Sequence, residues 1–297
     1  MRITLSDRQV VYAETYGKKT NPAVFLIHGG PGDSAYTFKL LAHRLSESFR
    51  VIVSEQRGCA RSDFAHEQTM TVRQLIADFE EIREAFNIRQ WLILGHSFGG
   101  IIAIEYAVQK PESILGIVLE NPAIDIFDSA RCILENYILF FEHRGDSCRV
   151  KRIQRILADN CKTELIKAVD DFPNHIKNEF WGFDRLPEVY CEILKMSAEI
   201  GSQNQKREIF KKSLLKDAVL YDDGWSKLKA VSLPVRLIYG ECDYITNQRI
   251  RDLFLQNAHL GSVCRIDSSG HYIHLDNSDK MAESIYQFAA EVIHGLD

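Results

Sequence analysis

A serine stands between two glycines in Gly95-His96-Ser97-Phe98-Gly99, directly after the apolar run 91–94 and before a run of small, helix-forming residues. In such a G-x-S-x-G turn between a strand and a helix, the glycines permit a sharp backbone turn that holds the serine hydroxyl clear of the sheet. The positive end of the helix dipole favours negative charge that develops beside it. This context predicts a nucleophilic Ser97 and not a serine that only caps the helix.

A serine hydroxyl becomes an effective nucleophile when a base takes its proton, so Ser97 requires a histidine that a carboxylate orients. Both occur downstream in the order serine, acid, histidine. Asp243 follows the apolar run that ends at Gly240, and His271 follows Ser269-Gly270. Each is expected at the carboxyl end of a strand, where open α/β sheets build their sites. We predict a catalytic triad of Ser97, Asp243 and His271.

Other carboxylates are weaker candidates for the acid of the triad. Glu241 leaves the strand two positions earlier and would point differently, and Asp125 or Asp128 after the fourth strand is a distant second. Among the other histidines, His96 flanks the serine and is expected to contact substrate. His274 is expected to line the site or to pack beside it.

Acyl chemistry also requires hydrogen-bond donors for the developing oxyanion. The backbone N–H of Phe98 is available at the turn, and His28-Gly-Gly-Pro-Gly32 ends an earlier strand that should lie next to it. Pro31 has no N–H, so Gly30 is the second predicted donor, with Gly29 as the alternative donor and a predicted substrate contact. The rival interpretation of these glycines is a phosphate cradle, but no lysine follows them as a P-loop would require.

The elements that must hold these residues alternate between short apolar runs and amphipathic segments. Four apolar runs predict strands that are buried on both faces of a sheet, at residues 23–27, 49–54, 91–94 and 114–119. Helical periodicity between them implies parallel strands joined by crossover helices. We therefore predict an α/β fold with a mostly parallel sheet and helices on both faces.

This alternation stops in the middle of the chain. Residues 123–221 contain no short β-branched run bounded by turns, and they predict amphipathic helices at 126–143, 149–160, 164–170, 188–200 and 206–215. Strand-like runs return at 233–240 and 262–267. We expect one core domain, made of residues 1–122 and 222–297, into which a helical cap domain at 123–221 is inserted.

Composition excludes several classes of protein. The 297 residues have a formal net charge of −5, and the basic clusters at 149–155 and 206–216 are expected to be solvated helix faces, which disfavours nucleic acid as a partner. No apolar run reaches the roughly 18 residues of a membrane span, and the first residues have no signal-peptide pattern. Seven scattered cysteines show no zinc spacing. We expect a cytoplasmic chain without metal, cofactor or membrane partner, and we make no prediction of its oligomeric state.

Five motifs together resemble the α/β-hydrolase superfamily, and more narrowly its proline iminopeptidase-like branch of serine peptidases. They are His28-Gly-Gly-Pro-Gly32, Glu55-Gln-Arg-Gly58 with Arg61-Ser62, the turn from Gly95 to Gly100, Gly240 to Asp243, and Ser269 to His271. The pair HGGPG and QRG-x-x-RS is specific for this branch, whereas the serine turn alone would fit any esterase. The resemblance covers the core, and it implies the same triad and the same two oxyanion donors.

This chain departs from the pattern of that branch at several positions. Glu55 and Ala60 replace an aspartate and a glycine of the common motif, and these changes are expected to shape a loop. The cap matches only in position and length. Iminopeptidases bind the N-terminal ammonium of a peptide with cap glutamates. The resemblance implies Glu179 as the counterpart here, with Glu188 or Glu192 as the alternatives. Trp181 beside it is a second predicted substrate contact.

These residues favour a serine hydrolase that forms an acyl-enzyme, most directly a proline iminopeptidase-like aminopeptidase or amide hydrolase on a small molecule or short peptide. A carboxylesterase, lactonase or thioesterase on a small acyl compound would use the same catalytic residues. Buried acidic pairs in the cap would favour the amine-bearing substrate. An acyl chain would require an apolar tunnel, for which the candidates are Phe140, Phe141, Phe180 and Trp181. A ligand-binding receptor on a hydrolase fold, which predicts a damaged triad, is the remote alternative.

Overall fold

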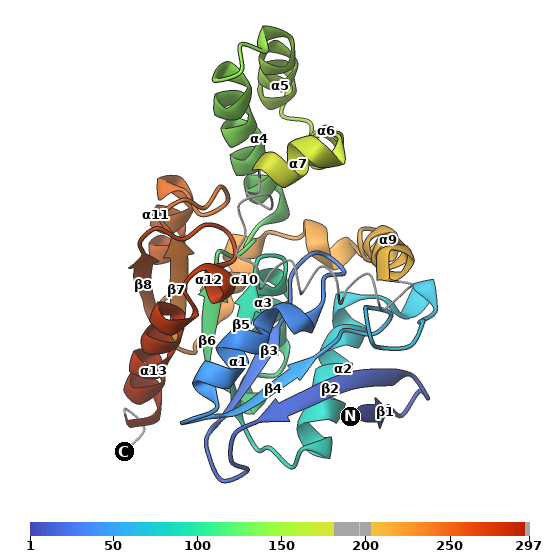
Figure 1. Cartoon of the computed structure of the whole chain (residues 1–297), viewed down its shortest axis with the longest axis vertical. Helices are drawn as coiled ribbons and strands as arrows, with labels where there is room; N and C mark the ends of the chain where they lie inside the picture. Colours follow the sequence, from blue (N-terminus) through green and yellow to red (C-terminus); the bar gives the residue numbers. More distant parts are fainter. Residues whose placement is uncertain (181–195, 197–202, 295–297) are drawn as a thin grey trace.

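A sheet of eight strands forms the centre of the molecule in the computed structural model, which describes residues 1–180, 196 and 203–294 (Figure 1). Across the sheet the order is β1 (Arg2–Thr4), β2 (Val10–Tyr16), β4 (Arg50–Ser54), β3 (Ala23–Ile27), β5 (Trp91–His96), β6 (Ile114–Glu120), β7 (Val235–Gly240) and β8 (Gly261–Ile266). β2 runs antiparallel to both of its neighbours, and the strands from β4 to β8 are parallel. The predicted α/β fold is confirmed.

The central strands are buried on both faces because helices cover both sides of the sheet. One side carries α2 (Val72–Ala85), α3 (Gly99–Gln109), α10 (Gly224–Ala230) and α11 (Gln248–Asn257), and the other carries α1 (Lys39–Leu45), α12 (Ile273–Asp276) and α13 (Ser278–His294). In β3, Val24 and Leu26 enter one apolar cluster, whereas Phe25 and Ile27 enter the other. This alternation follows from the two-residue period of a strand.

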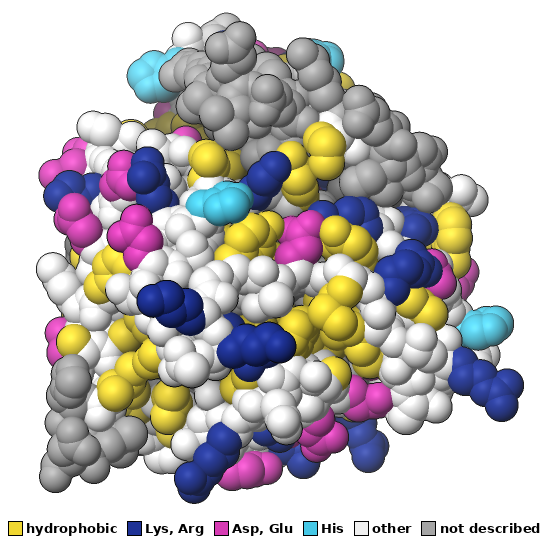
Figure 2. Space-filling view, turned by 60° about the horizontal axis from the view of Figure 1, so that its bottom comes forward, with side chains coloured by type: hydrophobic (Ala, Val, Ile, Leu, Met, Phe, Trp, Pro, Cys, Tyr) yellow, Lys and Arg dark blue, Asp and Glu magenta, His cyan; other side chains and the backbone are white. Residues whose placement is uncertain are grey.

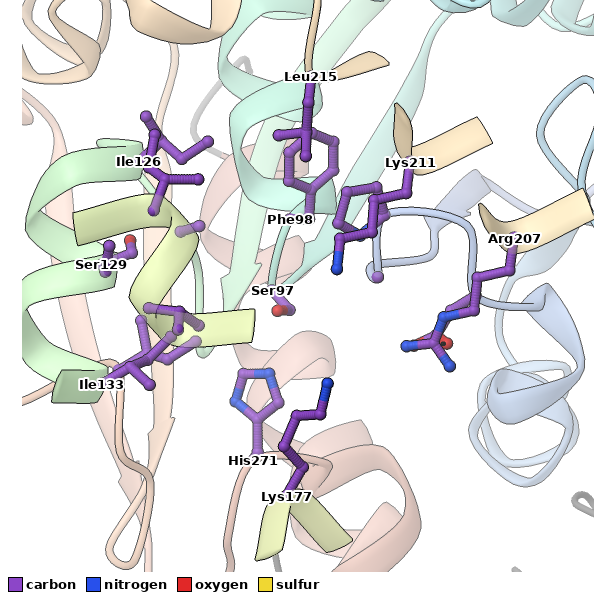
Figure 3. A pocket seen from close by; sticks show the side chains of 18 of the residues that line it. Ser97, Phe98, Ile126, Ser129, Ile133, Lys177, Arg207, Lys211, Leu215 and His271 are labelled. Atoms are coloured by element: carbon purple, nitrogen blue, oxygen red, sulfur yellow. Dashed lines mark ion pairs between the residues drawn. The ribbon is translucent and has the colours of Figure 1, made fainter. Parts of the chain in front are cut away.

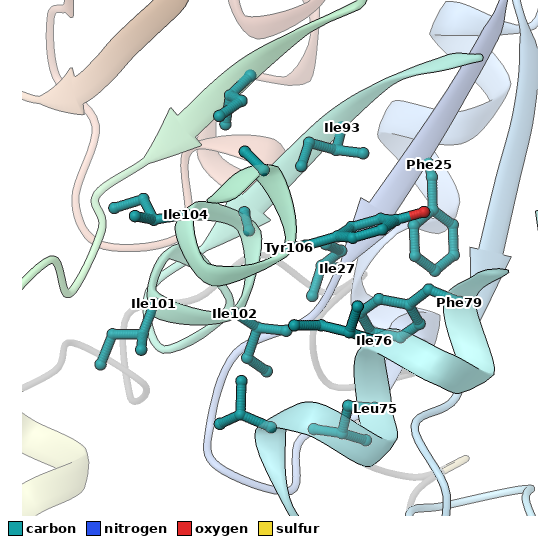
Figure 4. Packing of buried hydrophobic residues seen from close by; sticks show 14 of the residues in the cluster. Phe25, Ile27, Leu75, Ile76, Phe79, Ile93, Ile101, Ile102, Ile104 and Tyr106 are labelled. Atoms are coloured by element: carbon teal, nitrogen blue, oxygen red, sulfur yellow. The ribbon is translucent and has the colours of Figure 1, made fainter. Parts of the chain in front are cut away.

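Aromatic side chains fill the core between the sheet and helices α2 and α3. Figure 4 shows Phe25 and Ile93 of the sheet against Phe79 of α2 and Tyr106 of α3. The Phe25 ring stacks on Trp91 at a centroid distance of 4.5 Å and meets Phe79 edge-on at 4.9 Å. Since burial of such a side chain contributes about 1.5–3 kcal/mol, this packing fixes β5 and α3, which flank Ser97.

Between β6 and β7 the chain leaves the sheet and forms a set of helices. They are α4 (Ile126–Glu142), α5 (Ser147–Asp159), α6 (Lys162–Asp170), α7 (Asn174–Phe180) and α9 (Gln203–Leu214), followed by a short 3-10 turn (Ala218–Tyr221) and α10. We call residues 126–214 the cap segment. Helices α4 to α7 project beyond the sheet in Figure 1. The helix predicted at 188–200 lies, apart from Met196, outside the described residues.

The projecting helices of the cap segment have an apolar cluster of their own. The ring of Tyr137 stacks on Phe180 at 3.9 Å and lies 4.3 Å from Phe172. Phe141 is buried in the same cluster, and the partly buried Phe140 packs against it. None of these aromatic residues is among the described residues that line the pocket below. They form the interior of the cap segment and not the wall of an acyl tunnel.

The surface mixes the two signs of charge. On the face shown in Figure 2, Lys and Arg side chains are interspersed with Asp and Glu side chains and with apolar ones.

Among the described residues, no helix combines the length and the apolar character that crossing a bilayer requires.

Candidate active site

Ser97 occupies a strained turn between β5 and α3. Its φ angle is +52°, a left-handed conformation that costs a residue with a side chain about 1–3 kcal/mol. Close packing explains the glycines around it. A Cβ atom on Gly95 would lie 2.5 Å from the carbonyl oxygen of Gly99, and one on Gly99 would lie 2.5 Å from that of Ile27. The turn is held by a hydrogen bond from Ser97 N to Glu120 O at 3.0 Å.

Asp243 and His271 form a buried, hydrogen-bonded pair at the same edge of the sheet. His271 Nδ1 lies 2.7 Å from Asp243 Oδ1, and the second carboxylate oxygen accepts hydrogen bonds from the N–H groups of Ile245 and Thr246. An ionised carboxylate can only accept, so Nδ1 of His271 carries the proton and Nε2 has its lone pair. In Figure 3, Ser97 and His271 face each other in the pocket that both line.

The competing carboxylates all have other partners. Glu241 pairs with Arg265 at 2.7 Å and accepts a hydrogen bond from Ser268 N. Asp125 caps the first turn of α4, and Asp128 pairs with an arginine of α11 at 2.6 Å. Of these acids, the structure brings only Asp243 to the histidine.

Asn121, which sequence reasoning missed, joins the acid strand to the histidine loop. This fully buried side chain directly follows β6. Its Nδ2 donates to the carbonyl oxygens of Gly270 and His271, both at 2.9 Å, and its Oδ1 accepts from Gly240 N at 3.0 Å. The only available signal was a polar residue at the carboxyl end of an apolar run.

A second group of buried ionisable side chains lies directly behind the histidine. His274 donates to Glu120 from its backbone N–H and from Nδ1, each at 2.9 Å, and both side chains are fully buried. His96 Nδ1 lies 3.5 Å from Glu120, and its ring lies 4.9 Å from that of His271. Burial holds the pKa of His96 well below its usual range, so this imidazole is neutral.

The burial of His96 and His274 shows whether each ring can reach the pocket. His96 is 2% exposed and is not among the described residues of the pocket lining, so the structure places it in the packing around the site. His274 packs as well. The ligand atoms of His96, Glu120 and His274 lie within 4.8 Å of one another, which a metal ion could bridge. Hydrogen bonding between Glu120 and His274 already accounts for their arrangement, so the geometry gives no reason to invoke an ion.

The HGGPG loop lies against the serine turn. Gly30 has a φ of +119° and lines the pocket together with Phe98. A Cβ atom on Gly29 would lie 2.8 Å from the carbonyl oxygen of His96 and 3.0 Å from the Cβ of Ser97. Gly29 therefore provides close packing and is absent from the described lining, while the two predicted oxyanion donors, Gly30 and Phe98, both reach the pocket.

The second motif of the resemblance holds this loop in place. Gln56 donates from its backbone N to His28 Nε2 at 3.1 Å and from its side chain to His28 O at 2.9 Å. The buried Glu55 carboxylate accepts hydrogen bonds from Ser34 Oγ and from the backbone N–H of Ala35, each at 2.8 Å. The glutamate that replaces the family's aspartate thus serves as a loop anchor.

Helix α9 of the cap segment contacts both the HGGPG loop and the motif at residues 55–62. Lys206 is buried and donates to the carbonyl oxygens of Ala60 and Ser62 at 2.8 and 2.6 Å. A Cβ atom on Gly32 would lie 3.1 Å from the Cα of Arg207. The prediction that residues 206–216 form a solvated face is therefore wrong at Lys206, because this lysine crosses to the core and binds its carbonyl groups.

A pocket of about 640 Å³ opens above Ser97 and His271. Its described lining includes apolar side chains of α4 and α6 and three cationic side chains, Lys177, Arg207 and Lys211. Glu179, which is predicted to bind an ammonium group, forms an ion pair with Arg144 and is not among the described residues that line the pocket. Trp181 and the alternative glutamates Glu188 and Glu192 lie outside the described residues.

Comparisons with known proteins support the same fold. A family model described as alpha/beta hydrolase fold matches residues 22–143. A proline iminopeptidase of Neisseria gonorrhoeae is 34% identical over 120 residues, which are 40% of this chain and 38% of that protein. The chain thus matches well under half the length of this relative.

Two solved structures resemble the whole chain. The proline iminopeptidase of Mycobacterium smegmatis has a TM-score of 0.72 at 17% identity, with 100% of this chain and 99% of that chain covered. The enol-lactonase of Burkholderia xenovorans LB400 has a TM-score of 0.68 at 16% identity, with 98% and 100% covered. At these identities the likeness shows the fold alone. The α/β-hydrolase fold and the resemblance to its proline iminopeptidase-like branch are confirmed.

Proposed function

We propose that this chain, which has the α/β-hydrolase fold, is a serine hydrolase that works through an acyl-enzyme. One observation carries the proposal: the 2.7 Å hydrogen bond between His271 Nδ1 and the buried Asp243 Oδ1, beside a pocket that also holds the strained Ser97. This bond sets the tautomer in which Nε2 of the histidine can take a proton from the serine.

In the proposed reaction, Ser97 Oγ attacks the carbonyl carbon of the substrate while His271 Nε2 takes its proton. The carbonyl π electrons move to oxygen, and the backbone N–H groups of Gly30 and Phe98 stabilise the resulting oxyanion. Collapse of this intermediate breaks the bond to the leaving group, which takes the proton from His271. Water then attacks the acyl-enzyme in the same way, which releases the acid and restores Ser97. Asp243 stays ionised and stabilises the imidazolium.

The first candidate substrate is a short peptide or small amide with an N-terminal amine. The motif resemblance and the proline iminopeptidase relatives support it. An ammonium group would require carboxylates in the pocket, and the described ones are Asp33 and Glu208. Asp33 already lies 3.7 Å from the guanidinium of Arg207. The described lining thus gives this candidate limited support.

A carboxylesterase, lactonase or thioesterase acting on a small acyl compound is the second candidate, and the described pocket favours it. Ile126 and Ile133 of α4 and Ile166 of α6 provide an apolar wall. The glutamate expected to bind an amine, Glu179, pairs elsewhere.

The test is a panel of substrates on the full chain with Ser97→Ala as the control. The panel compares prolyl and alanyl anilides with acyl esters and acyl lactones, and mass spectrometry follows labelling by a fluorophosphonate. We expect a label on Ser97 and ester turnover that Ser97→Ala abolishes. Unchanged turnover in Ser97→Ala would overturn the mechanism. Faster turnover of prolyl anilide than of any ester would favour the first candidate substrate. A protein that is neither labelled nor active would favour the ligand-binding receptor.

Three further features belong to the same proposal. A helical cap domain at 123–221 covers the site of a core domain made of 1–122 and 222–297. The enzyme acts in the cytoplasm on a small molecule or short peptide. It requires no cofactor, and neither nucleic acid nor a membrane is a partner.

A further inference from the structure

The carboxyl end of β6 contacts the backbone of both reacting segments. Ser97 N donates to Glu120 O at 3.0 Å, and Ala123 N donates to Ser97 O at 2.9 Å. Asn121, between these two residues, binds the loop that carries His271. This strand end therefore holds the serine turn and the histidine loop at the same time.

The Glu120 side chain extends this contact to the residues after His271. Glu120 is the last residue of β6 and is fully buried. Its Oε1 accepts a hydrogen bond from the backbone N–H of His274, and both of its carboxylate oxygens lie 2.9 Å from His274 Nδ1. His274 stands three residues after His271. One residue thus contacts the serine turn through its carbonyl group and the histidine loop through its carboxylate.

The pair of Glu120 and His274 costs the fold stability that an apolar pair would not. A carboxyl group withdrawn from water loses its hydration, and hydrogen bonds must offset that loss. The offset is incomplete here, because His274 Nε2 has no hydrogen-bond partner among the described residues. Natural proteins accept such costs chiefly at functional sites. The position of this pair, directly behind the reacting residues, indicates a role in their geometry.

The ring of His274 supports the ring of His271 through one intermediate side chain. Its centroid lies 4.5 Å from that of Phe38 and 4.8 Å from that of His96. The His96 ring in turn lies 4.9 Å from the His271 ring. Since protein interiors are close-packed, a shift of His274 would displace His96 and then His271. The hydrogen bonds of Glu120 therefore fix both the backbone of this loop and the packing behind its imidazole.

We propose that Glu120 and His274 are positioning residues of the serine hydrolase. Their hydrogen bonds hold the loop of His271 against the serine turn, so that His271 Nε2 stays in place to take the proton of Ser97. Neither side chain belongs to the described lining of the pocket, so both act through His271 and not on the substrate. This inference rests on the proposed function and adds two residues to its machinery.

The test measures how fast a fluorophosphonate labels Ser97 in the full chain, which requires no knowledge of the natural substrate. Labelling at several reagent concentrations gives a maximal rate constant, kinact, and the concentration for half of that rate, KI. Misplacement of a reacting group by about 1 Å can lower a rate by roughly a hundredfold. A positioning role therefore predicts that loss of the pair lowers kinact and leaves KI unchanged.

The decisive variant replaces both members of the pair with apolar residues of similar size, Glu120→Met together with His274→Leu. Removal of both polar partners typically costs less stability than removal of one, so we expect this chain to fold. We expect kinact to fall by about 10–100-fold, with KI within about twofold of the wild-type value. Thermal unfolding measures the stability of each variant.

Single substitutions test whether the hydrogen bond is the cause. His274→Asn keeps an N–H donor near the place of Nδ1, whereas His274→Leu introduces a side chain of nearly the same size without a donor. We expect His274→Asn to retain kinact within about threefold of wild type, and His274→Leu to lose about as much as the double variant. This comparison also decides the question if the double variant does not fold.

Glu105→Met is the matched control. Glu105 of α3 is also buried and pairs with Lys227 at 2.8 Å, but it is not in the described lining of the pocket. Its substitution removes a buried carboxylate of the same kind at a place without contact to His274. We expect a lower Tm and an unchanged kinact.

The possible outcomes separate this inference from the proposed function. Wild-type kinact in the folded double variant would overturn the positioning role, while the hydrolase stands. A rise of KI at constant kinact would do the same, as would an equal loss of kinact in Glu105→Met. A folded His274→Asn chain that is labelled as slowly as His274→Leu would exclude the hydrogen bond as the cause. If the wild-type chain is not labelled at Ser97, the proposed function itself fails.

Discussion

An ion pair of the core and an ion pair of the cap segment differ in burial. In the core, Arg57 pairs with Asp78, and both side chains are almost fully buried. In the cap segment, Arg152 and Asp171 form a pair in which each side chain is more than half exposed. Breaking a buried pair leaves an uncompensated charge and typically costs about 3–5 kcal/mol, whereas an exposed pair contributes about 0–1 kcal/mol.

This contrast separates two tasks within one chain. The groups proposed to react are held by buried hydrogen bonds at strand ends, as at Asp243 and Asn121. Part of the pocket lining, such as Ile126 and Ile133 of α4, stands on helices of the cap segment. We therefore expect substitutions at the buried strand ends to lower activity more than substitutions on the exposed faces of the cap helices.

The largest effect is expected at the acid of the core. Asp243→Asn should lower kcat by roughly 10⁴-fold, because an amide that donates to His271 selects the wrong tautomer. Steady-state kinetics on an acyl ester measure this loss. Glu241→Gln, two residues earlier and paired with Arg265, is the control and should retain the wild-type rate. Wild-type activity in Asp243→Asn, with loss in Glu241→Gln, would place the acid at Glu241.

Matched aromatic deletions should distinguish the two apolar clusters. Phe79→Ala in the core should lower the free energy of unfolding by about 3–5 kcal/mol, because it empties the space between α2 and the sheet. Phe172→Ala in the cap cluster should lower Tm less and raise KM, since that cluster supports helices that line the pocket. Thermal unfolding and substrate titration measure both effects. Equal losses of Tm with unchanged KM would argue against a separate role for the cap segment.

Substitution of Asn121, whose buried amide joins β7 to the loop that carries His271, should have an intermediate effect. Asn121→Ala deletes three hydrogen bonds, and we expect kcat to fall by about 10–100-fold with little change in KM, as loss of about 1–3 kcal/mol of positioning energy implies. Asn257→Ala, whose side chain donates only to Leu253 O, is the control. A proportional rise in KM at constant kcat would show that Asn121 acts on binding and not on the position of His271.

The smallest effect is expected at an exposed ion pair of the cap segment. Arg152→Ala should change the free energy of unfolding by less than about 1 kcal/mol, and high salt should remove the difference. Urea unfolding at low and high salt measures it. A loss of several kcal/mol would mean that the cap's surface charges support the fold, which would contradict the division of tasks.

Much of the core could be predicted from the sequence because its signals are local. The turn at Ser97 requires glycines within two residues, and the acid and histidine follow apolar runs that end at the same sheet edge. Asn121 was missed because its partners Gly240 and His271 are 119 and 150 residues away. The pairing of β6 with β7, and of β7 with β8, brings them together.

The cap segment could be predicted as helices but not as a binding surface. Helical periodicity indicates which residues share a face, and it says nothing about what that face meets. Lys206 and Lys211 therefore look like solvated lysines, although one binds core carbonyls and the other lines the pocket. Only the family resemblance predicts Glu179 in the site, and it cannot show that Arg144, which follows α4, is its partner. His96 adjoins the serine, but its side chain points behind the site.

The cap segment rests on both halves of the reacting centre. Its ring Phe180 stacks on Tyr244, the residue after the acid, at 4.4 Å, and α9 contacts the HGGPG loop at Gly32. Because these contacts are direct, changes on their two sides are not independent of each other. Substitutions at Phe180 and Tyr244 should therefore have non-additive effects on stability.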